Sequence, residues 1–118
     1  MREGLGILLM SGGHERAHYA FVLATGAAAI GRDVVLFATN EGCHALTADI
    51  AAFDSATVPG VAGLTELREA ATAFGVRMIA CEAGLRIADI QAPLLQGVEI
   101  AGVVTFLEAT KQWQIITL

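Results

Sequence analysis

The sequence predicts an α/β domain, in which a parallel sheet is covered by helices. Short apolar runs alternate with longer amphipathic segments, which is typical of strands joined by helical crossovers. Several of these runs are almost continuously apolar, as in strands buried on both faces. A chain of 118 residues is long enough for one real core but not for two, so we expect a single domain over residues 1–118.

The first half of the chain is predicted to contain strand, helix, strand and short helix, separated by small or turn-forming residues. Ser11-Gly12-Gly13 divides the first strand from the first helix. Gly31 follows that helix, where a residue without Cβ takes the left-handed conformation at little cost. We expect a strand over residues 5–10, a helix over 14–30, a strand over 34–38, a short helix over 44–53 and a loop over 54–61, which contains Pro59 and Gly60.

The second half continues the alternation. Leu64, Leu67, Ala71 and Phe74 recur at helical spacing on one face, and Gly75 follows them. We then expect an apolar strand over residues 76–80 that ends at Cys81, a tight turn into a helix, a short helix at 93–95, a strand over 98–100, a helix over 102–111 and a last strand over 113–118.

Composition excludes several classes of partner. The net charge is −5, and the 7 Lys and Arg residues are scattered along the chain, which argues against a nucleic-acid surface and against a patch for anionic lipid. No apolar run approaches the length of about 18 residues that a transmembrane helix needs. Peripheral association with membrane partners stays open. The first residues do not have the layout of a signal peptide, so we expect a cytoplasmic protein with reduced thiols.

The apolar content points to self-association. Hydrophobic residues make up 55% of the chain, more than the interior of a small domain can hold. We therefore expect part of this apolar surface to lie between subunits of a homo-oligomer.

Three loops with polar or reactive residues follow predicted strands. They are residues 11–14, residues 40–44 and the segment that begins at Cys81. Sites in parallel sheets gather beyond the carboxyl ends of the strands, so we expect these loops to meet at one edge of the molecule.

Cys81 is the main candidate for chemistry. A thiol between a strand and a helix meets unpaired backbone N–H groups and the positive end of the helix dipole, and both favour the reactive thiolate. Glu82 opposes this effect unless its side chain points away. The spacing Cys81-x-x-Gly84-x-Arg86 is similar to the rhodanese active-site loop, in which Arg neutralises a sulfur anion. The alternative is that Cys81 is a small buried residue with a structural role.

Cys43 is a second candidate. It follows Gly42 in a predicted loop, which favours exposure. As a partner of Cys81 it would resolve a sulfenate or persulfide through a transient disulfide, provided that the two Cα atoms come within about 7 Å. The alternative is a loop residue without a role.

The first loop is a candidate ligand site. Backbone N–H groups of Gly12 and Gly13 are suited to an anion, and His14 is placed to donate a hydrogen bond to it. With Asn40 of the second loop they form the predicted ligand-binding group. A tight turn between strand and helix explains the glycines better. His14 and His18 lie four apart on a predicted helix, which leaves metal binding through His and Cys as a third alternative. We expect no metal site, because no His or Cys pair has the context of a zinc site.

Several segments together resemble the DsrE/DsrF-like family, and within it the branch often labelled DsrE-like or "peroxiredoxin family". They are Ser11-Gly12-Gly13, Ala20-Phe21, Ala27-Ala28-Ala29, Val34-Val35-Leu36-Phe37, Cys81 after its strand, and the segment from Leu95 to Leu107, which contains Gly-Val-Glu-Ile-Ala-Gly-Val-Val-Thr-Phe-Leu. The resemblance covers nearly the whole chain in the same order. The chain departs from that branch in the residues after Cys81 and in the loop over 40–44.

The resemblance implies a three-layer α/β/α fold around a five-stranded parallel sheet, and trimers or hexamers. It also implies a sulfur relay in which Cys81 carries a persulfide from a donor protein to an acceptor. We therefore expect a sulfurtransferase-like carrier without an organic cofactor, with Cys81 as the carrier, Arg86 balancing charge and Cys43 assisting. The competing expectation is a non-enzymatic module that binds a small molecule or a protein, in which Cys81 is structural.

Overall fold

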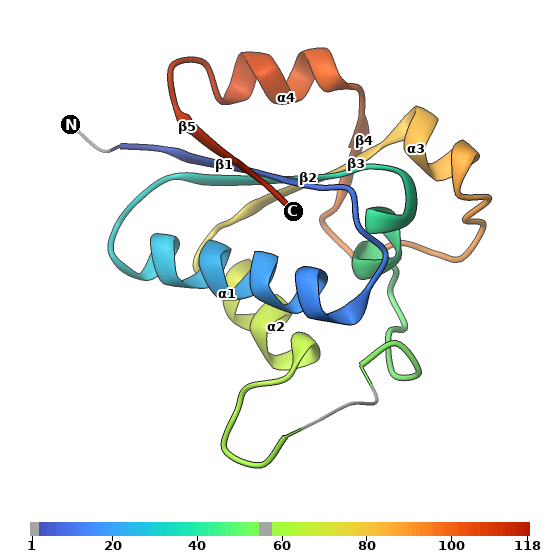
Figure 1. The fold of residues 1–118 in the computed structure, drawn as a ribbon. Coiled ribbons are helices and arrows are strands. Elements are labelled where there is room, and N and C mark those ends of the chain that lie inside the picture. Colours follow the sequence, from blue (N-terminus) through green and yellow to red (C-terminus); the bar gives the residue numbers. More distant parts are fainter. Residues whose placement is uncertain (1–2, 55–57) are drawn as a thin grey trace.

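Five parallel strands form the centre of the molecule. The fold is shown in Figure 1 as a computed structural model, which describes residues 3–54 and 58–118. The sheet has the order β4-β3-β2-β1-β5, and each neighbouring pair is parallel. The predicted α/β fold with a five-stranded parallel sheet is therefore confirmed. The strands are β1 (Leu5–Leu9), β2 (Val34–Ala38), β3 (Arg77–Cys81), β4 (Glu99–Ala101) and β5 (Gln114–Thr117).

Helices cover both faces of the sheet. The chain moves from β1 outward to β4 and then returns to place β5 on the other side of β1. Because crossovers between parallel strands are right-handed, this return places the last helix on the opposite face from the first two. Figure 1 shows α1 (His14–Ala29) and α2 (Leu64–Ala73) below the sheet and α4 (Val103–Ala109) above it. The short helix α3 (Glu82–Ile87) begins where β3 ends.

Two cores of unequal size fill the layers. The deep core lies between the sheet and the pair α1 and α2, and its members include Phe21, Leu36 and Leu64, each 0% exposed. The thin core lies under α4 and consists of Val35, Phe37, Ile79 and Phe106 with partly buried neighbours. The rings of Phe37 and Phe106 stack with centroids 4.9 Å apart, so one aromatic contact supplies much of the packing of α4 on the sheet.

Two predicted short helices are absent. Residues 40–46 form instead a 3₁₀ helix, η1 (Asn40–Leu46), and neither 44–53 nor 93–95 forms an α-helix. Segments 46–48 and 93–95 pair in antiparallel fashion, with Ala48 N–H donating to the Pro93 carbonyl and Leu95 N–H to the Leu46 carbonyl, each at 2.8 Å. This pairing occupies backbone groups that helices would have used. The predicted loop over 54–61 lies partly outside the described residues, and its described part contains no helix or strand.

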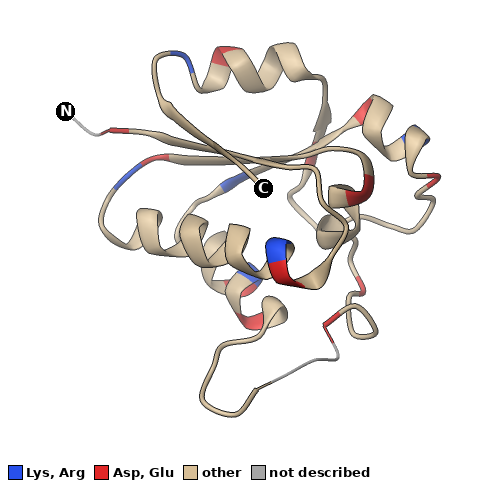
Figure 2. Cartoon of the chain, in the orientation of Figure 1, with Lys and Arg blue, Asp and Glu red and all other residues tan. Residues whose placement is uncertain are grey.

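Over residues 3–54 and 58–118, the basic residues do not gather into one patch. Figure 2 shows Lys and Arg spread singly over several elements, as the sequence predicts. In the described part of the chain, no helix combines the length and the apolar character that crossing a membrane requires.

Candidate functional site

The three predicted loops meet beyond the carboxyl ends of β1, β2 and β3. Gly42 N–H donates to the Met10 carbonyl at 3.1 Å, which ties η1 to the loop after β1. A Cβ added at Gly12 would lie 2.7 Å from Glu41 Cβ. On the other side of η1, a Cβ added at Gly84 would clash with the backbone N of Asn40 and lie 2.9 Å from the Cα of Thr39. The loop after β2 is thus packed between the other two.

Cys81 is the N-cap residue of α3. It ends β3 in extended conformation, and its Sγ accepts a hydrogen bond from Gly84 N–H at 3.4 Å. This is the position in which Ser or Thr usually caps a helix, with sulfur in place of oxygen. The side chain is half-buried and packs against the thin core. The sulfur therefore has a backbone donor on one side and remains partly open to solvent.

A hollow of about 360 Å³ opens beside Cys81. Its walls come from the start of α3 and from the turn between β4 and α4, and they are formed by Cys81, Glu82, Ala83, Arg86, Gly102 and Val103. Sequence reasoning missed Gly102 and Val103. Their signal is that they follow β4, the next parallel strand, so topology brings them to the same edge.

Arg86 pairs with Glu82 rather than with Cys81. Its Nη2 donates to Glu82 Oε1 at 3.2 Å, one helical turn away, and the two side chains are 81% and 64% exposed. An exposed pair of this kind contributes little stability. It does place a guanidinium next to the carboxylate that flanks Cys81, so the charge of Glu82 is partly balanced at the rim of the hollow.

Cys43 is buried, which corrects the expectation of exposure. The side chain is 0% exposed, and its Sγ donates to the Ala38 carbonyl at 3.4 Å. Burial raises the pKa of the Cys43 thiol to about 11, although the backbone N–H of Cys81 works in the opposite direction. At neutral pH, Cys43 is therefore a protonated thiol beside the backbone of Cys81, and the thiolate needed for attack is scarce.

The two cysteines pack on opposite faces of the sheet. Cys43 belongs to the deep core, whereas Cys81 packs against the thin core. Both are free thiols. A disulfide requires the two Cβ vectors to face each other, an arrangement that packing against different cores disfavours.

The residues of the predicted ligand group have different partners within the protein. His14 Nε2 forms a hydrogen bond with Asp54 Oδ1 at 2.8 Å, so the His14 side chain holds the segment before α2 in place. Gly13 is the N-cap residue of α1, and Gly12 packs against the backbone and Cβ of Glu41. Asn40 has a positive φ of 53° and accepts a hydrogen bond from the Thr39 hydroxyl at 3.0 Å. Of these residues, Asn40 lies nearest the Cys81 site, since its backbone N packs against Gly84.

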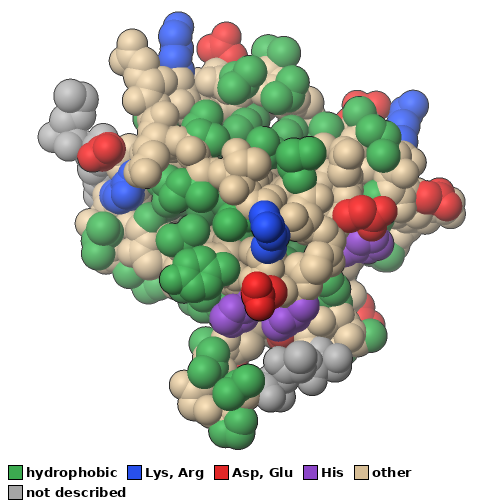
Figure 3. Space-filling model, viewed as in Figure 1, with side chains coloured by type: hydrophobic (Ala, Val, Ile, Leu, Met, Phe, Trp, Pro, Cys, Tyr) green, Lys and Arg blue, Asp and Glu red, His purple; other side chains and the backbone are tan. Residues whose placement is uncertain are grey.

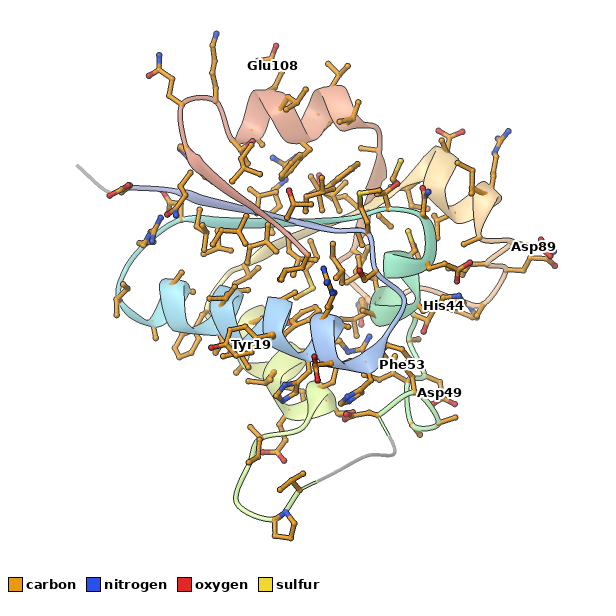
Figure 4. All side chains as sticks on the ribbon, in the orientation of Figure 1. Tyr19, His44, Asp49, Phe53, Asp89 and Glu108 are labelled. Atoms are coloured by element: carbon orange, nitrogen blue, oxygen red, sulfur yellow. The ribbon has the colours of Figure 1, made fainter. Side chains whose placement is uncertain are left out.

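The histidines do not gather with other metal ligands. His44, labelled on η1 in Figure 4, pairs with Glu41 at 2.9 Å. His18 contacts the Ala62 carbonyl at 2.8 Å. Within residues 3–54 and 58–118, no three His, Cys, Asp or Glu side chains lie close enough together to hold a metal ion.

An exposed apolar patch adjoins the hollow. Val103, Val104 and Leu107 of α4 are 53%, 70% and 53% exposed, and we call these three residues the α4 patch. Figure 3 shows hydrophobic side chains on the surface over α4. Glu108, labelled in Figure 4, is the acidic residue within α4. Val103 belongs to both the patch and the hollow, so a molecule docked on α4 would adjoin Cys81.

Comparison with known proteins identifies the family. Among solved structures, the chain is similar to the ychN protein from E. coli, with a TM-score of 0.77 and 22% identity over 100% of both chains, a likeness that shows the fold. No curated protein sequence matches the chain. The model of the DsrE/DsrF-like family matches residues 4–118. That family is generally linked to sulfur relay, and its members are often oligomeric. This chain belongs to the DsrE/DsrF-like family.

Proposed function

We propose that this protein is a sulfur carrier that holds a persulfide on Cys81 and passes the outer sulfur to an acceptor thiol. The observation that carries the proposal is the half-buried Cys81 sulfur at the mouth of a hollow, with Gly84 N–H donating to it. A backbone donor in this place is suited to negative charge on the sulfur of a thiolate or a persulfide. Family membership supports the same chemistry.

The transfer proceeds in two exchanges. The Cys81 thiolate attacks the outer sulfur of a donor persulfide, the donor's S–S bond breaks, and the donor leaves as a thiolate. An acceptor thiolate then attacks the outer sulfur now on Cys81, and the Cys81 thiolate leaves. One S–S bond forms as another breaks in each exchange, so no oxidant, reductant or bound cofactor is consumed.

The neighbouring residues have supporting roles in this proposal. Arg86 offsets the charge of Glu82 at the rim, where a donor or acceptor enters. Cys43, buried behind the backbone of Cys81, supports the position of the carrier as a neutral thiol, and it assists as a resolving thiol only after local opening. The proposed setting is the cytoplasm, where thiols are kept reduced.

The proposed assembly is a homo-oligomer, a trimer or a hexamer, that covers the α4 patch. Three exposed apolar side chains lie on this one short helix, and exposed apolar surface of this kind often marks a contact between proteins. Because the patch adjoins the hollow, the same contact would narrow the approach to Cys81 and limit which proteins deliver or receive sulfur.

The test is intact mass after exposure to a low-molecular-weight persulfide. We expect one added sulfur on the wild type and on Cys43→Ser, and none on Cys81→Ser. A second incubation with an excess of small thiol should remove the added sulfur. Absence of any adduct on the wild type, with Cys81 unreactive toward a thiol probe, would favour the binding module with a structural cysteine and overturn the proposal.

A further inference from the structure

A second cavity lies away from the cysteines. It is a groove of about 590 Å³ between one side of α2 and the antiparallel pairing of 46–48 with 93–95. It is larger than the hollow beside Cys81, which measures about 360 Å³, and the two share no lining residue. The groove is lined by Thr65, Arg68, Glu69 and Thr72 from α2, with Leu95 and Gln96 opposite.

Arg68 brings a buried positive charge to this groove. It is 5% exposed, and its guanidinium donates to backbone carbonyls of Ala45, Thr47 and Ala48. Its Nε has no hydrogen-bond partner. Among the described residues no carboxylate forms an ion pair with it, although Asp54 and Glu69 act on its pKa through space, against the larger effect of burial. Burying a guanidinium without a counter-ion destabilises the fold, so a ligand carboxylate that pairs with Arg68 would relieve this penalty.

Arg77 in the same chain shows what Arg68 lacks. Its Nε and Nη2 donate to the two carboxylate oxygens of Glu99 at 2.6 and 2.9 Å, in the two-donor geometry that suits a carboxylate. On Arg68, Nη2 is held by the Ala48 carbonyl at 3.1 Å, and Nε donates to no acceptor. A shift of the guanidinium away from Ala48 would present the same edge to a ligand.

Glu69 restricts what kind of anion fits. This residue is exposed, follows Arg68 on α2 and lines the same groove. Its carboxylate repels a simple anion, such as phosphate, but attracts an ammonium group carried by the same molecule. The apolar Leu95 on the opposite wall favours a hydrocarbon body.

We propose that this groove binds a small apolar α-amino acid. The ligand's carboxylate pairs with Arg68, its ammonium group faces Glu69, and its side chain lies against Leu95. This site is independent of the sulfur chemistry at Cys81, and it stands or falls separately from the proposed carrier function.

The test is a nuclear magnetic resonance titration of the full chain with L-leucine. We expect saturable shifts of the Arg68 Nε–H resonance and of the amides of Thr72 and Gln96, with a Kd of about 1 mM. Isopentylamine, which lacks the carboxylate, should bind about tenfold more weakly or worse. 4-Methylpentanoate, which lacks the ammonium group, should bind about threefold more weakly, because its missing partner is exposed.

Glu69→Gln provides the discriminating variant. Arg68 is left unchanged, because it also holds the backbone carbonyls of residues 45, 47 and 48 and its replacement would disturb the fold. In Glu69→Gln, leucine and 4-methylpentanoate should bind equally, whereas Glu66→Gln, on the same helix but outside the groove, should keep the preference for leucine. Lack of saturation by leucine up to about 50 mM overturns the proposal. Tighter binding of inorganic phosphate than of leucine, or an unchanged preference in Glu69→Gln, overturns it as well.

Discussion

The two faces of the sheet differ in depth, and each contains one cysteine. Under α1 and α2, the deep core encloses Cys43 completely. Under α4, the thin core is closed largely by the Phe37–Phe106 contact and leaves Cys81 half-buried at its end. A residue under the deep layer serves stability, while a residue at the edge of the thin layer remains available for chemistry and for contact with another molecule. The same side chain therefore has different uses on the two faces.

The largest effect should follow from opening the deep core. Phe21 is 0% exposed, and Phe21→Ala should lower the free energy of unfolding by about 4 kcal/mol, because it leaves a cavity that the packed helices cannot fill. Denaturant unfolding measures this loss. Tyr19→Ala on the same helix removes a ring that is 54% exposed and should change the free energy by less than about 1 kcal/mol. Equal losses in the two variants would contradict the described depth of this face.

A substitution at Gly84, where α3 packs against the loop after β2, should lower stability nearly as much. Gly84→Ala places a Cβ against the backbone of Thr39 and Asn40, so α3 must move and take Cys81 with it. We expect a loss of about 3 kcal/mol in stability and slower persulfide loading. Gly13→Ala is the matched control, because a Cβ there meets no atom within 4 Å. Normal stability and loading in Gly84→Ala would show that the loop after β2 does not position the carrier.

The cysteines themselves allow a direct comparison of the faces. At pH 8, a water-soluble thiol reagent should modify Cys81 at least about 100-fold faster than Cys43, measured by mass spectrometry with Cys43→Ser and Cys81→Ser. Burial protects Cys43, and its pKa of about 11 keeps it protonated. In denaturant the two rates should converge. Similar rates in the native protein would mean that the deep core opens readily around η1.

The hydrogen bonds of Asp54 should make the stability of the protein depend on pH in the acid range. Burial alone would raise the pKa of Asp54, but hydrogen bonds from His14, Thr65 and Leu64 outweigh it and lower the pKa from 3.8 to about 2. The ionised Asp54 carboxylate therefore contributes its full stabilisation of the folded protein above about pH 4. This contribution is lost as the pH falls through 2.

Asp54→Asn should accordingly lose about 2 kcal/mol at neutral pH, and the difference from the wild type should shrink between pH 4 and pH 2. Chemical unfolding at several pH values measures both. A constant difference across this range would contradict the account of the His14–Asp54 contact.

The smallest effect on stability should come from the outer side of α4. Val104 is 70% exposed, so Val104→Glu should change the free energy of unfolding of the monomer by less than about 0.5 kcal/mol. If the α4 patch joins subunits, the same variant should lower the molar mass measured by light scattering. Glu108→Gln, which keeps the polarity of α4, should leave the mass unchanged. An unchanged mass in Val104→Glu would place any subunit contact elsewhere.

The regular elements could be predicted because their signals are local. The apolar runs that form β1, β2 and β3 and the one-sided spacing of α2 follow from the residues alone, and parallel topology then brings the three loops together. The environment of Cys81 at a strand end was predictable in the same way. The Arg86–Glu82 pair also follows from spacing, since residues four apart on a helix face each other.

The errors arise where distant segments decide the structure. Thr47 and Leu94 lie in segments that were expected to be helical, but their backbones form an antiparallel bridge. Cys43 follows a glycine, which suggests an exposed loop, but Gly42 lies against the Leu9 carbonyl and draws the loop inward. The partner of His14 was equally unpredictable, because its Nε2 lies 2.8 Å from Oδ1 of Asp54, 40 residues away. None of these partners is visible in the neighbouring sequence.

The position of β5 has a consequence for biosynthesis. β1 lies between β2 and β5, and the carbonyl of Leu118 also accepts from Met10 N–H at 2.8 Å. As the chain leaves the ribosome, β2 is available soon after β1, but the other edge of β1 has no partner until residues 114–117 have emerged. Until then an apolar strand with unpaired backbone groups is open to association with other chains. Rapid engagement of this edge by a chaperone, or slow translation before β5, would thus alter the yield of folded protein without any change in its final stability.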